Sequence, residues 1–234
     1  MEKMVLKKGL NNILSSVSSK HWAEQIIDIS LIRQEKELRI TDEFHASSAG
    51  NCPRLIQLRM NGIFREKIEP RVQRIFDVGT SMHRRYREYF LNAGKLISDE
   101  VPIRINIEGI VIVGRADLLV KDLVDKPQVL EGKSMNTRRF GELLSSGIYI
   151  EENFLQWNIY SKGLEVPEGA IIYENKDDQR IKVFSVNYND EKFLQVVNVF
   201  KMINEYNKQE KLVPKPLLCP DPKYCGAIKL CKEK

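Results

Sequence analysis

Residues 101–135 read VPIRINIEGIVIVGRADLLVKDLVDKPQVLEGKSM, and the patterns in this stretch decide the fold. From 101 to 107 apolar residues alternate with polar ones, which predicts a half-buried strand that ends at Glu108-Gly109. We expect its hairpin partner over residues 110–120, then a polar turn that contains proline, and a third strand over 128–135. The stretch therefore predicts a three-stranded antiparallel meander.

Two acidic residues and one lysine fall on the second and third strands of this meander. Glu131 and Lys133 project to the same side of their strand, because successive side chains alternate, and Gly132 leaves its carbonyl free between them. Asp117 lies on the neighbouring strand, so both carboxylates and that carbonyl can converge on one hard divalent cation, Mg²⁺ or Mn²⁺. Such a cation activates a bound water, and Lys133 orients the water or stabilises developing charge, which fits phosphodiester hydrolysis. The alternative is a solvated strand face that carries opposite charges.

Length and composition favour one integrated catalytic domain. The chain has 234 residues, 42% of them hydrophobic, which is enough for one substantial core. Its formal net charge of +5 suits a local basic groove better than a surface that is basic throughout. No apolar run approaches the roughly 18 to 20 residues of a membrane span, and the N-terminus lacks a secretory signal pattern. We therefore expect a cytoplasmic protein with no membrane partner, encoded by a bacterium, an archaeon, a phage or a plasmid.

Helical periodicity marks much of the remaining chain. We expect helices at five places: residues 1–40, where a second run extends from His21 to about Ile32, 53–60 with Ser47 or Ser48 as N-cap, 70–93, the second half of 140–163, and 190–208. A second hairpin joins residues 170–173 to residues 181–186. The predicted fold class is α/β (α+β), with three parts: an N-terminal helical lid or brace (1–45), a core (46–213) and a cysteine-rich tail (214–234).

Three polar residues on the predicted helices could join the site. His83 shares a helix face with apolar residues and so turns inward, although an inward histidine is also common as a satisfied core residue. Gln156 and Tyr160 lie one helical turn apart on one face. They could grip a phosphate and orient the water, or they could be ordinary helix polarity.

The four cysteines are distributed unevenly. Cys52 stands alone near the front, whereas Cys219, Cys225 and Cys231 fall within a short tail rich in proline. Clustered cysteines in a reducing compartment more often bind metal than form disulfides, and four thiolates can hold a [4Fe-4S] cluster or a zinc ion. Four buried thiols are the remaining alternative. A centre that joins Cys52 to the tail would close a long loop, so we expect a structural role.

The order of these elements resembles a known family. Its motifs are Cys-Pro-Arg at 52–54, Gly-x-x-x-His at 79–83, Gly-Arg-Ala-Asp at 114–117, Glu-Gly-Lys at 131–133, Gln-x-x-x-Tyr at 156–160 and the three late cysteines. This order resembles the iron-sulfur branch of the PD-(D/E)xK nucleases, which includes RecB-like, AddB-type and CRISPR-associated exonuclease domains. The resemblance implies a restriction-endonuclease-like core, in which helices flank a mixed central sheet.

The resemblance also implies roles for individual residues. His83, Asp117, Glu131 and the Gly132 carbonyl would bind Mg²⁺ or Mn²⁺, and the catalytic residues would be Asp117, Glu131, Lys133, Gln156 and Tyr160. A [4Fe-4S] cluster would be held by Cys52, Cys219, Cys225 and Cys231, with zinc as the second choice. The chain departs from the family at Ala116, where proline is usual, and in its Cys-x5-Cys-x5-Cys spacing, where Cys-x2-Cys-x5-Cys is commoner.

We therefore expect a DNA exonuclease that acts on single strands or free ends, in repair, recombination, replication or DNA processing. The chain lacks a Walker A motif, so any helicase or recombination motor would be a separate subunit. Phosphates along the strand path would meet Arg84, Arg85, Arg115, Arg138, Arg139 and Lys176. Two alternatives remain open: a non-cleaving nucleic-acid-binding or assembly subunit, and an endonuclease that trims DNA for a recombination or CRISPR-adaptation complex.

Overall fold

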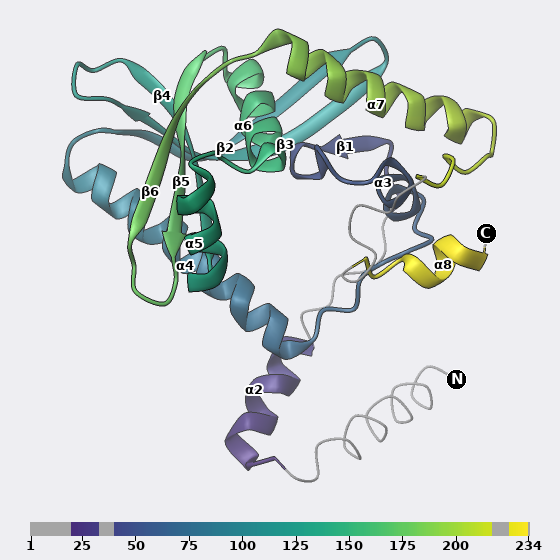
Figure 1. Cartoon of the computed structure of the whole chain (residues 1–234), viewed down its shortest axis with the longest axis horizontal. Coiled ribbons are helices and arrows are strands. Elements are labelled where there is room, and N and C mark those ends of the chain that lie inside the picture. The colour runs from purple at the N-terminus through teal and green to yellow at the C-terminus, as the bar shows by residue number, and fades with distance from the viewer. Residues whose placement is uncertain (1–19, 33–39, 217–224, 234) are drawn as a thin grey trace. The chain divides into compact units, whose positions relative to one another are not determined.

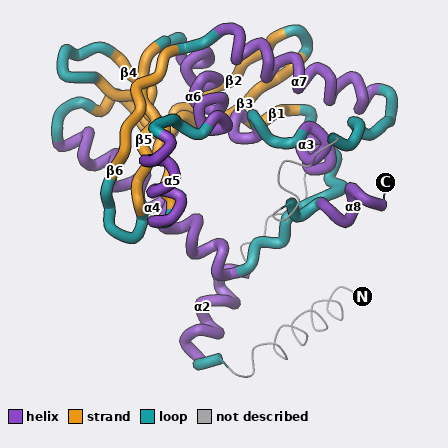
Figure 2. Tube along the Cα trace, viewed as in Figure 1, coloured by secondary structure: helices purple, strands orange, loops and turns teal. Residues whose placement is uncertain are grey.

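The computed structural model describes residues 20–32, 40–216 and 225–233, and it divides the chain into two compact units (Figures 1 and 2). The first unit comprises Met1–Glu37 and Lys67–Phe76, and the second comprises Leu38–Glu66 and Asp77–Lys234. Within the first unit, helix α2 (Trp22–Ile32) confirms the helix expected to begin near residue 21. The helical run expected before it lies outside the described residues.

A buried carboxylate organises the described part of the first unit. Asp28 accepts hydrogen bonds from Lys20 Nζ and Arg74 Nη1, both at 2.6 Å. These two hydrogen bonds lower the pKa of Asp28.

In the described residues, no helix of either unit is long and apolar enough to cross a bilayer.

The second unit is built on a six-stranded mixed sheet. Its strands are β1 (Glu43–His45), β2 (Leu96–Ile107), β3 (Ile110–Lys121), β4 (Pro127–Met135), β5 (Glu168–Asn175) and β6 (Ile181–Asn187). They follow the order β1-β3-β4-β5-β6, and β2 pairs with β3. The β1–β3 and β4–β5 pairs are parallel and the others are antiparallel. The antiparallel meander of β2, β3 and β4 is therefore confirmed.

A two-residue turn sets the register of the first hairpin. Glu108 and Gly109 both have positive φ, 48° and 77°, as hairpin turns that match the twist of the strands require. Ile107 therefore pairs with Ile110, and the register continues along the two strands to Val101 opposite Ala116.

Helices cover both faces of the sheet (Figure 1). Those that contact the strands are the later turns of α4 (Pro70–Asn92), α5 (Thr137–Ser146), α6 (Glu151–Leu164), α7 (Asp190–Lys208) and the 3-10 helix η1 (Ala46–Ser48). Helix α3 (Pro53–Met60) packs against α7, and α8 (Ile228–Glu233) is the last described element. On one face α6 packs against β2, β3, β4, β5 and α7 around the buried Trp157. On the other face, Met82 and Tyr86 of α4 pack on the strands in a smaller core.

The structure corrects four details of the sequence analysis. The first half of residues 140–163 is also helical, because α5 ends at Gly147 in the left-handed conformation before α6 begins. The N-cap of α3 is Cys52, not Ser47 or Ser48, and Ser48 instead donates to the carbonyl of His45. Phe76 lies seven residues before His83, so helical periodicity predicts it on the same inward face, but it is 50% exposed. The short strand β1 and helix α8 were not anticipated.

Gly169 lies on β5 and pairs with Val129 of β4, and its substitution should disrupt the sheet. A Cβ at this position would lie 1.9 Å from Val129 O, the oxygen that accepts the hydrogen bond of Trp157 Nε1. We expect Gly169→Ala to lower the free energy of unfolding by about 3 kcal/mol or more, measured by urea denaturation.

Gly141 on α5 is the matched control. Nothing lies within 4 Å of a Cβ there, so Gly141→Ala should raise the free energy of unfolding by about 1 kcal/mol. Equal effects of the two substitutions would contradict the close approach at Gly169.

Candidate active site

Asp117 and Gly132 meet where β3 and β4 run side by side. Asp117 Oδ2 accepts a hydrogen bond of 2.8 Å from Gly132 N. A Cβ on Gly132 would lie 2.9 Å from Met82 Cε and 3.5 Å from His83 Cδ2, so a side chain at position 132 would displace the end of the Met82 side chain and contact the His83 ring. Gly132 therefore lies directly beneath the part of α4 that carries His83.

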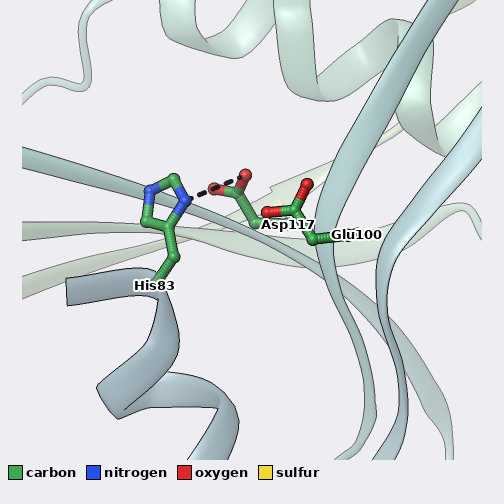
Figure 3. Close-up of side chains that lie close together, drawn as sticks. All are labelled: His83, Glu100 and Asp117. Atoms are coloured by element: carbon green, nitrogen blue, oxygen red, sulfur yellow. Dashed lines mark ion pairs between the residues drawn. The ribbon is translucent and has the colours of Figure 1, made fainter. Parts of the chain in front are cut away.

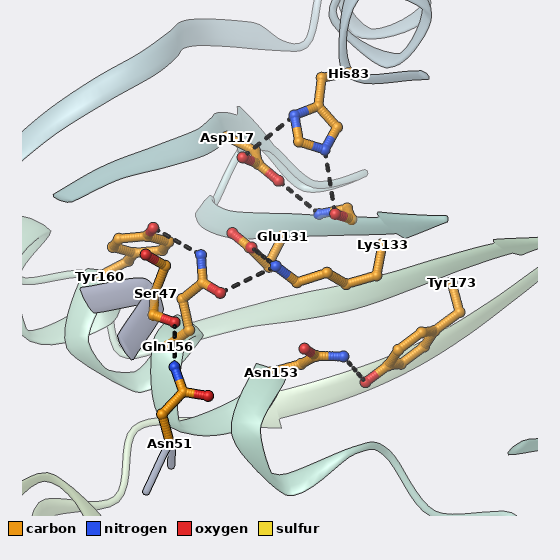
Figure 4. Close-up of polar contacts among 11 residues, drawn as sticks. Ser47, Asn51, His83, Asp117, Glu131, Lys133, Asn153, Gln156, Tyr160 and Tyr173 are labelled. Atoms are coloured by element: carbon orange, nitrogen blue, oxygen red, sulfur yellow. Dashed lines mark hydrogen bonds and ion pairs between the residues drawn. The ribbon is translucent and has the colours of Figure 1, made fainter. Parts of the chain in front are cut away.

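His83 reaches the same place from α4 (Figure 4). Its Nε2 lies 3.2 Å from the carbonyl oxygen of Gly132, and its Nδ1 lies 3.5 Å from Asp117 Oδ1. A carbonyl oxygen only accepts hydrogen bonds, so Nε2 carries the proton when this contact forms. Nδ1 then turns a lone pair toward the carboxylate, which leaves a place for a cation between them.

Glu100 completes a group that the sequence analysis missed (Figure 3). Ligand atoms of His83, Glu100 and Asp117 all lie within 4.8 Å of one another. The neighbours of Glu100 pair with the neighbours of Asp117, so Glu100 lies opposite Asp117 across the β2–β3 ladder. Its φ of 48° is rare for a residue with a side chain. Nothing in the sequence distinguishes this glutamate from other charges at strand ends.

The apolar side chains of β3 switch from one face of the sheet to the other at Asp117. Ala116 belongs to the core beneath α6, whereas Leu118 belongs to the core beneath α4, although a regular strand would point both to the same side. The irregularity coincides with the positive φ of Glu100 on the paired strand. Together they place Asp117 at the edge of both cores, between His83 and Glu100.

A row of hydrogen-bonded polar side chains runs from β4 to α6 (Figure 4). Lys133 Nζ lies 2.7 Å from Glu131 Oε1 and donates to Gln156 Oε1 at 3.0 Å. Gln156 Nε2 in turn donates to Tyr160 Oη at 2.8 Å. The structure therefore brings together the four residues that the sequence placed on one strand and on one face of a helix.

The Glu131 carboxyl is strongly perturbed. It is 1% exposed, and its Oε2 atom has no hydrogen-bond partner among the described residues. Burial, and then the nearby charge of Asp117, raise its pKa to about 8, while Lys133 opposes the shift. The Oε2 atom can bind a cation, because the positive charge would compensate for the hydration that the carboxylate loses on burial.

Lys133 and Tyr160, which belong to the same hydrogen-bonded row, keep their protons. Burial lowers the pKa of Lys133, but the charges of Glu131 and Asp117 outweigh it, so the pKa is raised overall. Burial, and then the charge of Glu131, raise the pKa of Tyr160. Lys133 is thus an ammonium and Tyr160 a phenol at neutral pH, and both can act as hydrogen-bond donors.

These residues surround an open cavity of about 470 Å³. Its walls are formed by His45, Ala46, Ser47, His83, Glu100, Val113, Gly114, Arg115, Asp117, Glu131, Lys133, Gln156 and Tyr160. His45 and Ser47 also line an adjoining cavity of about 510 Å³, which extends along η1 and α3. The site is thus open to a polymer that continues beyond it.

The predicted DNA-binding residues have different surroundings. Arg115 lines the cavity and forms an ion pair of 3.5 Å with Glu100. Arg85 does not line the cavity, and it pairs with the buried Glu174 at 2.6 Å while its side chain stays 40% exposed. Tyr86 donates to the same carboxylate. The remaining four do not line the cavity: Arg84, Arg138, Arg139 and Lys176.

Three cysteines line a separate cavity of about 200 Å³. Cys52 precedes α3, Cys225 precedes α8 and Cys231 lies on α8. Arg54 of α3 shares the wall with them. Cys219 lies outside the described residues.

Comparison with known proteins gives the fold. No protein-family model and no curated protein matches the chain. It is similar to the crystal structure of SSO0001, with 18% identity and a TM-score of 0.57 over 90% of this chain and 94% of that one. It is also similar to an alkaline exonuclease (LHK-Exo) from Laribacter hongkongensis, with 16% identity and a TM-score of 0.54 over 73% and 90%. The structure of LHK-Exo in complex with dAMP matches with 17% identity and a TM-score of 0.54 over 72% and 89%.

These likenesses confirm the predicted fold class. The chain has a restriction-endonuclease-like α/β fold, with a mixed central sheet flanked by helices.

The raised pKa of Glu131 predicts that the metal-free protein loses stability as pH rises. Between its ordinary value of 4.5 and about 8, the folded state keeps a proton that the unfolded state releases. The folded state therefore binds more protons, and the free energy of unfolding falls by up to about 1.4 kcal/mol per pH unit. Urea denaturation in EDTA across this range measures the slope. Glu131→Gln should remove that contribution, and an unchanged slope in the variant would contradict the assignment.

Proposed function

We propose that the chain is a Mg²⁺- or Mn²⁺-dependent DNA exonuclease that hydrolyses phosphodiester bonds in single strands or at DNA ends. One observation carries the proposal: the buried Glu131 carboxylate, with an unpartnered oxygen, faces an open cavity together with Asp117, Lys133 and His83. The alkaline exonuclease of similar fold supports the choice of reaction and substrate, because one of its structures is described in complex with dAMP.

The residues present fit a hard divalent cation. Asp117, Glu131 and the Gly132 carbonyl offer oxygen atoms, and His83 offers a ring nitrogen. These four residues would hold Mg²⁺ or Mn²⁺, and Glu100 adds a third carboxylate that the motif does not include. When bound, the cation supplies a Lewis acid for the phosphoryl group and lowers the pKa of water.

The chain's own residues position the water and the phosphate. Lys133 presents its ammonium to the cavity, held between Glu131 Oε1 and Gln156 Oε1, where it can orient a water or stabilise an oxyanion. Tyr160 accepts from the Gln156 amide, which fixes the carbonyl of that amide toward Lys133. Arg115 at the cavity wall can neutralise a phosphate of the strand. Binding of DNA phosphates by Arg84, Arg85, Arg138, Arg139 and Lys176 stays a prediction.

The four cysteines form a second part of the proposal. We infer that Cys52, Cys219, Cys225 and Cys231 bind a [4Fe-4S] cluster, with zinc as the alternative. Cys52 lines one cavity together with Cys225 and Cys231, although it lies far from both in the sequence, which supports a shared centre.

Lys133→Met should abolish cleavage, because it removes the ammonium while the cation ligands remain. We expect the cleavage rate to fall by a factor of about 10³ or more. The measurement is an anaerobic time course with Mn²⁺, on single-stranded DNA labelled separately at each end and on a circular substrate. Loss of one end label from the linear DNA, with the circle intact, identifies an exonuclease and its polarity.

The control is Lys126→Met, which removes a surface lysine that pairs with Glu168 outside the cavity. It should cleave like the wild type. Cleavage of the circle would instead identify an endonuclease. DNA binding without cleavage by the loaded wild type would favour a non-cleaving assembly subunit, and retained cleavage by Lys133→Met would refute the assigned mechanism.

Glu100→Gln should weaken Mn²⁺ binding by about tenfold or more, because it removes one of the charges nearest His83 and Asp117. The measurement is an EPR titration of free Mn²⁺ against the protein. Glu108→Gln is a matched control, since Glu108 has the same φ of 48° at the end of the same hairpin but lies outside the cavity. Equal affinities of the two variants would show that Glu100 has no part in the cation site.

A further inference from the structure

Arg54 is an arginine buried in the wall of the cysteine cavity. It is 4% exposed, and its Nη1 donates to the carbonyl oxygen of Val213 at 2.7 Å. Its Nε and Nη2 atoms are buried and have no hydrogen-bond partner in the described part of the chain. A guanidinium keeps its charge in proteins, so these two donors leave a buried positive charge only partly compensated.

Among the described residues, the lining of this cavity includes no carboxylate. Its other lining residues are Cys52, Leu55, Leu58, Lys215, Pro216, Cys225, Ala227, Ile228 and Cys231. Arg54 and Lys215 are the charged residues among them, and both are basic. A cavity with this lining would attract an anion, and its own thiols become anionic when they bind metal, because the ligand is the thiolate.

We propose that Arg54 is a positioning residue for an anionic metal-thiolate centre in this cavity, and that its Nε–H and Nη2–H donate hydrogen bonds to the sulfur atoms of that centre. The inference rests on the proposed cysteine centre and is independent of the proposed cleavage chemistry. It applies to an iron-sulfur cluster and to a zinc-thiolate site alike, since several thiolates leave either with net negative charge.

Arg54 has a matched control on its own helix. Arg59 lies one and a half turns further along α3, is exposed, and pairs with Glu66 at 3.4 Å. It does not line the cavity. Arg59→Met therefore removes an arginine from the same helix without removing a donor from the centre.

The experiment uses the full chain purified without oxygen. Iron, sulfide and zinc analysis first identifies the centre. If it is an iron-sulfur cluster, Arg54→Met should lower its reduction potential, because hydrogen bonds to sulfur and nearby positive charge favour the reduced form. Release of iron to a chelator should become about 10 to 100 times faster, as when supporting contacts of a metal site are lost. Arg54→Lys should recover part of both effects, and Arg59→Met should show neither.

If the centre holds zinc, the measured quantity is the rate of zinc release, and the expected effect of each variant is the same. Zinc release to a chelator should then accelerate in Arg54→Met by a similar factor, with Arg59→Met unchanged. In the iron-sulfur case, wild-type protein labelled with ¹⁵N-arginine gives a test that needs no substitution. Pulsed EPR of the reduced cluster should detect hyperfine coupling to arginine nitrogen.

Several outcomes would overturn the proposal. They are an unchanged potential and release rate in folded Arg54→Met, the absence of ¹⁵N coupling in the wild-type cluster, and purified protein that holds neither iron nor zinc. Cleavage of DNA by protein without any centre would leave the nuclease proposal standing while this one fails. A normal centre in protein that cleaves no DNA would do the reverse.

Discussion

The burial of the Glu131 carboxylate is the constraint on which the active site depends. A carboxylate that is 1% exposed has lost its water, and it must be neutralised or compensated by nearby charge. Lys133 compensates one oxygen at 2.7 Å, and the position of the lysine on the same side of β4 makes this possible. The second oxygen has no hydrogen-bond partner among the described residues, and Asp117 adds a negative charge close by. The proposed cation would compensate both charges, and His83 and Glu100 lie beside Asp117 at the same place.

Much of this could be predicted from local sequence, because local geometry determines it. The turn at Glu108-Gly109 needs positive φ at two successive residues and fixes the register of β2 with β3. The alternation within β4 places Glu131 and Lys133 on one side, and helical periodicity places Gln156 one turn before Tyr160. Each of these relations spans only a few residues, so neighbouring positions decide it.

The features that were missed depend on contacts between distant segments. Glu100 joins the site because β2 is irregular opposite Asp117, and β3 changes face there, which its alternating sequence does not reveal. The pairing of Arg85 with the buried Glu174 of β5 was likewise not anticipated, and its contact with DNA stays a prediction. The parallel pairing of β4 with β5 requires the crossover through α5 and α6, and no single stretch of sequence encodes that pairing. Such features follow from packing, where tertiary contacts override local pattern.

Two of the unpartnered buried groups stand in the walls of cavities, and their charges are opposite. Glu131 leaves an acceptor unpaired beside the polar cavity, whereas Arg54 leaves two donors unpaired beside the cysteine cavity. An unsatisfied buried group costs about 1 to 3 kcal/mol, and more when it is charged, so folding alone gives no reason to keep either. Proteins tolerate such costs at functional sites, where a ligand completes the interaction. A buried acceptor of negative charge calls for a cation, and buried donors of positive charge call for an anion. The two cavities thus fit the two proposed partners, a divalent metal ion in one and a metal-thiolate centre in the other.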